Sequence, residues 1–397
     1  MMDKDSNINI VEQEQKEEEI NTNKNVVDKS PSNLEPSKIE IDKLNKEEKK
    51  KRNRRILFSI LFIIANVIAI AVLVLLEDKN SNKIDFFNAM NLLGENVWWT
   101  ILAFSMFFII ILTDIFVFAI LIKKINGKTK NILPISIKTS FLGRYYEKIT
   151  PWSIGGEPYQ IFYLTYNGIK GSNTMSITSL RHIFRFFTDA IAILLILAIS
   201  FISTNVYVMI GAIFGILGGL IVPLFLLICA LKPKLGEKLI NVIIAIGAKI
   251  KLVKDKDAAK LKIKKDVETY SKNIKFGLKN IPLILIIAIC ALIELFANNF
   301  IPFFVIRALG VTNINIWETF VLCIYINYAS SFVPTPGGAG IAEISFYAVF
   351  DTYFNGGLLF WAILIWRIAY FYMPIIIGFF IQIAESVKII IKNKYSR

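Results

Sequence analysis

A few charged residues stand inside otherwise apolar stretches of this 397-residue chain. Arg181, Arg185 and Asp189 are spaced at i, i+4 and i+8, so they share one face of a helix. A charge in the middle of a membrane costs about 3 kcal/mol, so such residues usually face the protein interior and pair. Arginines there can hold phosphate, and carboxylates can meet a cation or relay protons. Three further charged residues lie in or beside stretches broken by proline and glycine, namely Glu157, Glu343 and Arg367.

Each of these residues has two interpretations, a ligand contact or an internal salt bridge. For Arg185 and Asp189 we predict a salt bridge along one helix. Asp114 could have either role, and Glu294 marks a further polar position. Arg181 could also lie at the cytoplasmic interface with its charged end in water. The predicted substrate-binding residues, with arginines for phosphate and glutamates for a cationic headgroup or protons, are Glu157, Arg181, Glu343 and Arg367.

Two broken stretches must position these residues, at 134–166 and 315–354. Backbone that leaves a helix inside a bilayer is tolerated only where it is buried in protein or lines a wet cavity. Glycine lets the chain turn or approach a ligand closely, proline sets the break, and a helix that starts after the break aims its positive end inward. We expect a gate built from Pro151, Gly155, Gly156, Pro334, Pro336, Gly337, Gly338 and Gly340.

Long apolar runs dominate the rest of the sequence. About 20 apolar residues form a helix about 30 Å long, the thickness of the hydrocarbon core of a bilayer. The chain is therefore predicted to be an all-α, polytopic membrane protein with about six full spans and two broken or re-entrant elements. The predicted spans are 56–76, 99–122, 175–202, 206–231, 281–306 and 358–383.

The spacing of the charges favours an inverted repeat. Arg181 follows Glu157 by 24 residues, and Arg367 follows Glu343 by the same interval. Counting the spans places the entry of 134–166 on the cytoplasmic side and that of 315–354 outside. Broken hydrophobic segments at matching places in two halves indicate a transporter-type site.

Composition excludes several classes of protein. The sequence is 55% hydrophobic, has a mean hydropathy of +0.55 and carries a net charge of +14, which rules out a cytosolic enzyme. Its three cysteines lie in apolar runs and are expected to be packing residues. Because His182 is the only histidine, a histidine-rich metal site is excluded. We expect no metal, no cofactor and no catalytic residue.

Charge placement predicts the topology and partners. Residues 1–45 form a predicted disordered cytoplasmic tail, 46–391 the membrane domain and 392–397 a basic cytoplasmic tail. The loop 232–279 holds 14 lysines and five acidic residues, which predicts a cytoplasmic position and leaves open whether it also contacts an anionic leaflet. We expect both termini in the cytoplasm, the cell membrane as location, phospholipid as partner and no nucleic acid, since aromatic residues for base stacking are scarce in the loop.

Residues 331–343 read Ser-Phe-Val-Pro-Thr-Pro-Gly-Gly-Ala-Gly-Ile-Ala-Glu. They are similar to the Pro-x-Pro-Gly-Gly-x-Gly-x-x-Glu signature of the flippase-like membrane domain of bacterial phosphatidylglycerol lysyltransferases, the lysylphosphatidylglycerol synthases, and their stand-alone relatives. Residues 150–157 and 367–378 resemble a first-half motif and the last conserved helix of that family, and the resemblance covers roughly 56–391. Gln160 departs from it, standing where relatives often carry arginine, and so does the four-residue Arg185–Asp189 interval, one longer than usual.

This resemblance implies translocation of a phosphate-bearing lipid, lysyl-modified lipids included, between leaflets. The alternative is a phosphatidylglycerol lysyltransferase, another membrane lipid or glycolipid transferase, or a subunit of one. In full-length relatives a separate soluble domain performs the transfer, and we expect that domain to be missing here because the chain ends 14 residues after Ile383.

Overall fold

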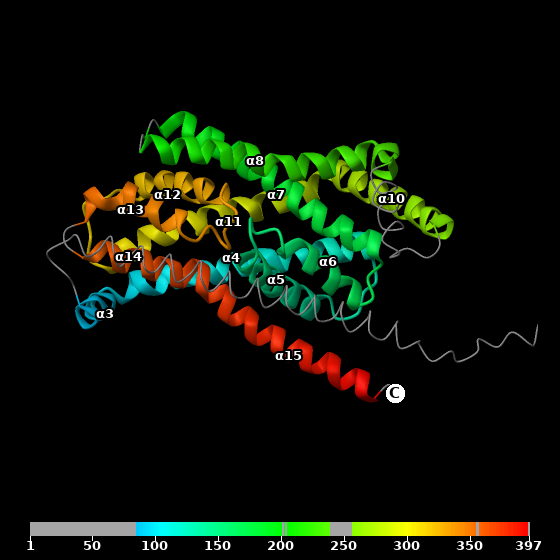
Figure 1. Ribbon diagram of the computed structural model, residues 1–397, viewed down its shortest axis with the longest axis horizontal. Helices are drawn as coiled ribbons and strands as arrows, with labels where there is room; N and C mark the ends of the chain where they lie inside the picture. Colours follow the sequence, from blue (N-terminus) through cyan, green and yellow to red (C-terminus); the bar gives the residue numbers. More distant parts are fainter. Residues whose placement is uncertain (1–84, 201, 203–204, 239–255, 355–356, 396–397) are drawn as a thin grey trace, which may run out of the picture. The chain divides into compact units, whose positions relative to one another are not determined.

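A computed structural model describes residues 85–200, 202, 205–238, 256–354 and 357–395, all within one compact unit, Phe62–Arg397. These residues are helical and contain no strand, which confirms the predicted all-α class. The α-helices, labelled in Figure 1, are α3 (Phe86–Glu95), α4 (Val97–Asn126), α5 (Ile132–Ile149), α6 (Gly156–Tyr166), α7 (Gly171–Ser200), α8 (Val206–Leu231), α10 (Lys256–Lys279), α11 (Ile281–Ala308), α12 (Ile316–Ser331), α13 (Ile341–Phe350), α14 (Leu358–Arg367) and α15 (Met373–Tyr395).

Five helical segments of the described chain are long and apolar enough to cross a membrane. Four are single helices that match predicted spans, α4, α7, α8 and α11. The fifth, Leu358–Lys388, joins α14 to α15 through a short π-helix, Ile368–Tyr372. Pro374 is the second residue after this π-helix and lacks the N–H that a continuous α-helix would need there. The predicted span 56–76 and the tail 1–45 lie outside the described residues.

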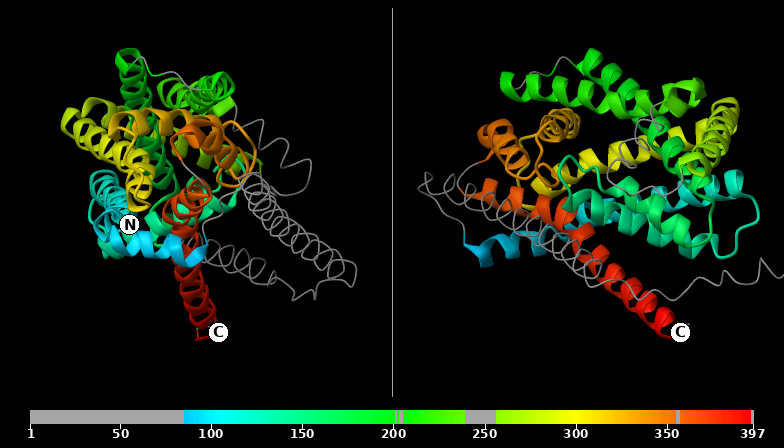
Figure 2. Two further views of the ribbon diagram at one scale, coloured as in Figure 1. Left: turned by 90° about the vertical axis from the view of Figure 1, so that its left-hand side faces the viewer. Right: turned by 45° about the vertical axis from the view of Figure 1, so that its right-hand side comes forward.

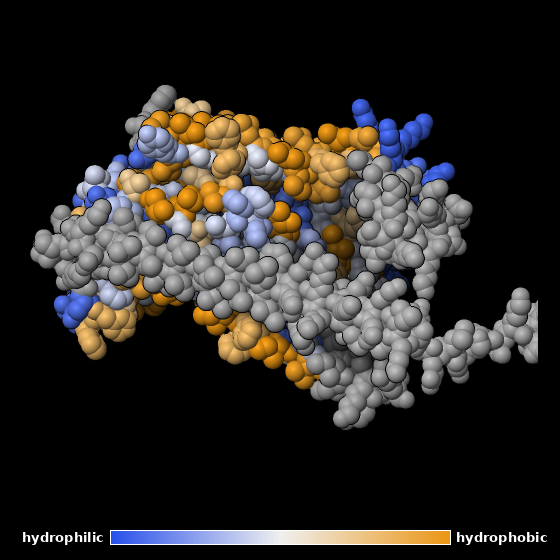
Figure 3. All heavy atoms as spheres, viewed as in Figure 1, coloured by the Kyte–Doolittle hydropathy of each residue, from blue (hydrophilic) through white to orange (hydrophobic). Residues whose placement is uncertain are grey.

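Apolar side chains on the outer face of the helices indicate what surrounds this protein. Along α8, Leu217, Ile221 and Phe225 are at least half exposed, and Figure 3 shows hydrophobic atoms along much of this helix. Exposed apolar surface of this extent suits contact with lipid rather than water. Hydrophilic atoms gather near the end of α8 and over α10 instead.

Hydrogen bonds at each end of the bundle show which helix termini lie together. Asn173, in the first turn of α7, donates to Asn126 at the end of α4 (2.9 Å) and accepts from Asn273 of α10 (3.0 Å). At the opposite end, Trp317 of α12 donates to Ser200 at the end of α7 (3.1 Å). The helices therefore alternate in direction, as the spans predict.

Each broken element is a pair of helices joined by a non-helical turn. The first is α5, residues 150–155 and α6, and the second is α12, residues 332–340 and α13. The first is less interrupted than its prolines suggest. Pro134 and Pro158 lie in the first turns of α5 and α6, where the missing N–H would have no helical partner.

The buried core surrounds α11, which packs against α4, α7, α12 and α14. One apolar cluster joins α11 to α12, α13 and α14, and a second joins it to α4, α7 and α10. The order long helix, broken pair, long helix occurs twice, as α4 to α7 and as α11 to α15. Figures 1 and 2 show the first broken pair toward the α10 end and the second toward the α3 end.

Candidate functional site

A network of buried charged side chains crosses the four helices α4, α5, α7 and α11, and Arg144 of α5 is at its centre. The Nε of Arg144 donates to the Asp114 carboxylate of α4 at 2.7 Å. One terminal nitrogen of Arg144 is hydrogen-bonded to Glu294 of α11, and the other lies 3.6 Å from Glu147 Oε2. Such a guanidinium can bind several carboxylates at once because its five N–H groups point outward in one plane.

Arg181 of α7 completes the shell around Asp114. Its Nε donates to Asp114 Oδ1 at 2.9 Å, and a terminal nitrogen contacts the same oxygen. The guanidinium also lies 5.2 Å from the ring centre of Phe118. Because only 7% of its side chain is exposed, the interfacial alternative for Arg181 is wrong. Asp114 is thus the shared partner of two arginines.

One helical turn further along α7, Arg185 is oriented toward Glu294 at 2.8 Å and toward Asp189 at 3.8 Å. The predicted Arg185–Asp189 salt bridge is confirmed, and Glu294 is the closer second partner. Unlike Arg181, Arg185 keeps 30% of its side chain exposed. It therefore lies where the buried network opens.

These groups form a charge cluster whose formal charges balance. Lys148 joins it through Glu147, at 3.5 Å. Removing one member of a buried pair costs about 3–5 kcal/mol because the remaining charge stays in a low-dielectric site without a partner. Four cations therefore need four carboxylates here. The charge cluster comprises Arg144, Lys148, Arg181 and Arg185 with Asp114, Glu147, Asp189 and Glu294.

Glu157 contacts His182 rather than an arginine. The Glu157 carboxylate, in the first turn of α6, forms its contact with Nδ1 of that histidine on α7. Both side chains are about 30% exposed, like Arg185 one turn away from His182. The Nε2 of His182 is buried and has no hydrogen-bond partner among the described residues. For Glu157, the salt-bridge alternative with an arginine is therefore not observed among the described residues.

Glu343 and Arg367, at the second break, form a buried pair. Glu343 Oε1 lies 2.7 Å from Arg367 Nε, while its Oε2 accepts from the Gly340 N–H at 2.7 Å and so caps α13. Arg367 Nη1 donates to the Gly337 carbonyl at 3.3 Å. The Nη2 of Arg367 is buried without a hydrogen-bond partner among the described residues. The pair therefore fixes the second turn and leaves donor capacity on the arginine.

The glycines of the second turn are required by its backbone. Gly337, Gly338 and Gly340 have φ values of 58°, 69° and 91°, a region that costs residues with a Cβ atom. A Cβ on Gly337 would also lie 2.0 Å from the Phe371 ring. Pro334 and Pro336 lie in the same turn.

The first turn is built differently from the prediction. Its left-handed residues are Trp152 and Ser153, at φ 50° and 58°, whereas Gly155 has an ordinary right-handed conformation. Gly155 packs against Thr150, whose hydroxyl accepts its N–H at 2.8 Å. A Cβ on Gly156 would lie 2.9 Å from the carbonyl oxygen of residue 143 on α5. These two glycines allow close packing rather than a turn.

The turns of the two broken elements meet. Pro151 and Pro336 form an isolated antiparallel β-bridge, and Trp152 Nε1 donates to the Phe332 carbonyl at 3.3 Å. The predicted gate prolines 151 and 336 are thus brought together from opposite halves of the sequence.

An aromatic contact connects the charge cluster to the segment that carries Arg367. The Lys148 ammonium lies 3.8 Å above the ring of Tyr370, in the π-helix that follows Arg367. Tyr370 stacks in turn on Trp366, the residue before Arg367. Lysine over an aromatic ring is an attractive arrangement in a desolvated site.

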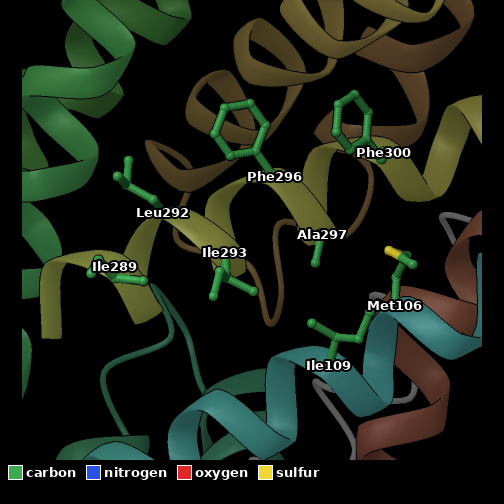
Figure 4. A pocket seen from close by; sticks show the side chains of 8 residues that line it. All are labelled: Met106, Ile109, Ile289, Leu292, Ile293, Phe296, Ala297 and Phe300. Atoms are coloured by element: carbon green, nitrogen blue, oxygen red, sulfur yellow. The ribbon is translucent and has the colours of Figure 1, made fainter. Parts of the chain in front are cut away.

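An apolar hollow of about 340 Å³ lies between α4 and α11. Figure 4 shows Met106 and Ile109 on α4, with the other lining side chains on α11. Ile293 lines the hollow, while its neighbour Glu294 belongs to the charge cluster. The same stretch of α11 therefore presents an apolar surface on one side and a carboxylate on another.

Sequence reasoning did not single out Arg144, Glu147 or Lys148. Their signal in the sequence is a group of two basic residues and one acidic residue within the first broken element. Among the described residues, no group of three or more His, Cys, Asp or Glu side chains is arranged to hold a metal ion.

Comparison with known proteins identifies the family. No curated protein matches the chain. The family described as the lysylphosphatidylglycerol synthase TM region matches residues 57–378, which is most of the sequence and includes both broken elements and the charge cluster. This chain is therefore a membrane protein that belongs to the family of lysylphosphatidylglycerol synthase transmembrane regions.

Proposed function

We propose that this protein translocates a phosphate-bearing lipid, including lysyl-modified lipids, between the two leaflets of the cell membrane. The observation that carries the proposal is a buried charge cluster that opens at Arg185, beside two broken helix pairs whose turns touch. A charge that is partly exposed within a membrane domain still needs water around it. A salt-bridge network that served only to stabilise the fold would therefore gain nothing from partly exposed members.

Arg185 is the proposed phosphate contact. Its side chain is partly exposed and its guanidinium is held by Glu294 and Asp189 at 2.8 and 3.8 Å, so a phosphate can replace the more distant carboxylate as its partner. Arg181 supports the site from behind, with Asp114 as its own partner. In this scheme the phosphate enters a neutral cluster and is not repelled by excess negative charge.

Glu157 is the proposed contact for a cation, which is either the ammonium of a lysyl headgroup or a proton. Its side chain is about 30% exposed, and the one ion pair that it forms with a described residue is with His182, which leaves its carboxylate available for a second cation. Glu343 and Arg367 are proposed as the matching site of the second half. The free Nη2 of Arg367 is the donor that a phosphate would meet there.

The apolar hollow between α4 and α11 is a suitable path for an acyl chain. It consists of hydrocarbon side chains and adjoins Glu294 through Ile293. A lipid placed with its chain in the hollow would carry its headgroup toward the polar opening. The contact between the turns at Pro151 and Pro336 is the proposed gate that separates the two leaflets. The lysines at the α10 end support a cytoplasmic position for that end and for both termini.

Purified protein in vesicles tests this proposal. Fluorescent phosphatidylglycerol placed in both leaflets is bleached from outside by a membrane-impermeant reductant. Without protein, we expect the reductant to bleach about half of the fluorescence. In vesicles with protein, we expect the bleached fraction to rise from about half toward all of it. A matched sample with lysyl-tRNA and phosphatidylglycerol measures the transfer of lysine from the tRNA to the lipid. Product formation without accelerated flipping would replace the proposal with the transferase alternative.

A further inference from the structure

A second hollow, of about 430 Å³, lies at the lysine-rich end of the bundle, and none of its lining residues belongs to the charge cluster. It is formed between the end of α8 and the last turns of α10. Lining residues include Pro233, Glu268, Lys272, Lys275, Phe276 and Lys279.

The walls of this hollow are fixed to one another by hydrogen bonds. The Ser271 hydroxyl of α10 donates to the Ala230 carbonyl at 2.6 Å, and the Tyr270 hydroxyl donates to the Leu226 carbonyl at 3.2 Å. Both acceptors lie in the last two turns of α8. The hollow is therefore a feature of packed helices and does not depend on the arrangement of a loop.

Charge distinguishes this hollow from the balanced cluster inside the bundle. Lys272, Lys275 and Lys279 are exposed, at positions i, i+3 and i+7 of one helix, and form no ion pair with any described residue. Glu268 is the single carboxylate of the lining. Three ammonium groups against one carboxylate leave a net charge of +2, so an anion can be bound without displacing a protein partner.

Apolar side chains next to the lysines indicate where the anion comes from. Phe276 lines the hollow and is 44% exposed, and Leu231 and Ile281, at the neighbouring helix ends, are 47% and 65% exposed. The hollow thus lies where the hydrocarbon-facing surface meets the polar end. A ligand at such a boundary carries both phosphate and acyl chains, which is the chemistry of a phospholipid.

We propose that this hollow is a binding site for the headgroup phosphate of an anionic phospholipid from the leaflet at the lysine-rich end. The lysines hold the phosphate, and the acyl chains lie along the apolar side chains at the adjoining ends of α8 and α11. This site is independent of the proposed lipid path, because it shares no residue with the charge cluster or the α4–α11 hollow.

Native mass spectrometry of the full chain in detergent, titrated with dioctanoyl phosphatidylglycerol, tests the site. The variant K272Q/K275Q/K279Q removes the three lysines of the hollow. The control K128Q/K264Q/K265Q removes three exposed lysines that do not line it. We expect affinity to fall about fivefold for each lysine removed from the hollow, so about a hundredfold for the triple variant, and about twofold or less for the control.

Two results would overturn the site. Equal losses in both triple variants would mean that the lysines act only through diffuse surface charge. Displacement of the lipid by inorganic phosphate at equal concentration would mean that the hollow binds a free anion and gains nothing from acyl chains. Flipping is measured separately in vesicles, so loss of lipid binding here with normal flipping would leave the proposed function intact.

Discussion

Pro151 and Pro336 form a β-bridge between two turns that lie 185 residues apart in the sequence, since 336 minus 151 is 185. Each turn joins a pair of helices, so the bridge connects the two broken elements, one from each half of the membrane domain. Residues opposite one another in an antiparallel pair have Cα atoms about 4.5–5.5 Å apart, within the range that a disulfide spans.

A P151C/P336C variant is therefore expected to form a disulfide on mild oxidation. If these turns separate when a lipid passes, the cross-link should reduce flipping at least about tenfold, and reductant should restore it. The background protein for this measurement has Cys229, Cys290 and Cys323 replaced by alanine, because all three are free thiols.

The control for the cross-link is each single cysteine variant, oxidised in the same way. Full flipping in a cross-linked sample, with the disulfide verified on a gel, would show that the contact at Pro151 and Pro336 is not a gate.

Arg144 is expected to be the most important residue of the charge cluster for stability. R144Q leaves Asp114 and Glu294 without their shared partner, and the expected loss is about 3–5 kcal/mol of unfolding free energy. K138Q is the comparison, since the Lys138–Glu385 pair is 31% exposed at the lysine and should be worth about 1 kcal/mol or less. Denaturant unfolding in detergent, followed by tryptophan fluorescence, measures both. Similar midpoints for R144Q and K138Q would contradict the buried network.

A double-mutant cycle distinguishes a stabilising ion pair between Glu343 and Arg367 from a role of these residues in binding a ligand. E343Q and R367M alone each leave one buried charge, with an expected loss of about 3–5 kcal/mol. E343Q/R367M removes both charges, so its loss should be smaller than the sum of the single losses. A double variant that is stable but does not flip lipid would support a ligand role. Additive losses of stability would instead mean that the two side chains do not interact.

The tight turn between α12 and α13 predicts intolerance of any side chain at Gly337. G337A places a methyl group against the Phe371 ring at a φ of 58°, and we expect a loss of about 2 kcal/mol or more. G218A is the matched control, because a Cβ there meets nothing within 4 Å on a regular stretch of α8. Thermal unfolding midpoints in detergent compare the two. A midpoint for G337A at or above that of G218A would contradict the strained turn.

The long apolar runs predicted the spans well, because hydrophobic length alone decides whether a helix can cross a bilayer. The run 206–231 matches α8 at both ends. The second break was also predictable, since Gly337, Gly338 and Gly340 occur where the backbone has positive φ. The first turn was not, because its left-handed residues are Trp152 and Ser153, whose types give no signal for that conformation.

Pairing between distant charges could not be read from the sequence. The i, i+4 spacing of Arg185 and Asp189 gave one ion pair along a helix, but Glu294 is more than 100 residues away and is the closer partner. Arg144 was missed because its partners on α4 and α11 come together only when the helices pack. The inverted repeat remains a prediction, supported by the repeated order of elements and the meeting of the two turns.

The most direct test of lipid translocation through the polar opening is the flipping rate of R185Q. Arg185 is the cation of the cluster whose side chain is partly exposed. When it is replaced, Arg144 still neutralises Glu294 and Asp189 loses its partner, so the flipping rate is measured on protein shown to be folded. The control is R307Q, an arginine at the other end of α11 that donates to a backbone carbonyl at 3.4 Å. We predict that R185Q flips phosphatidylglycerol about tenfold or more slowly than wild type, that R185K is intermediate, and that R307Q is unchanged. Wild-type flipping by a folded R185Q would contradict the account.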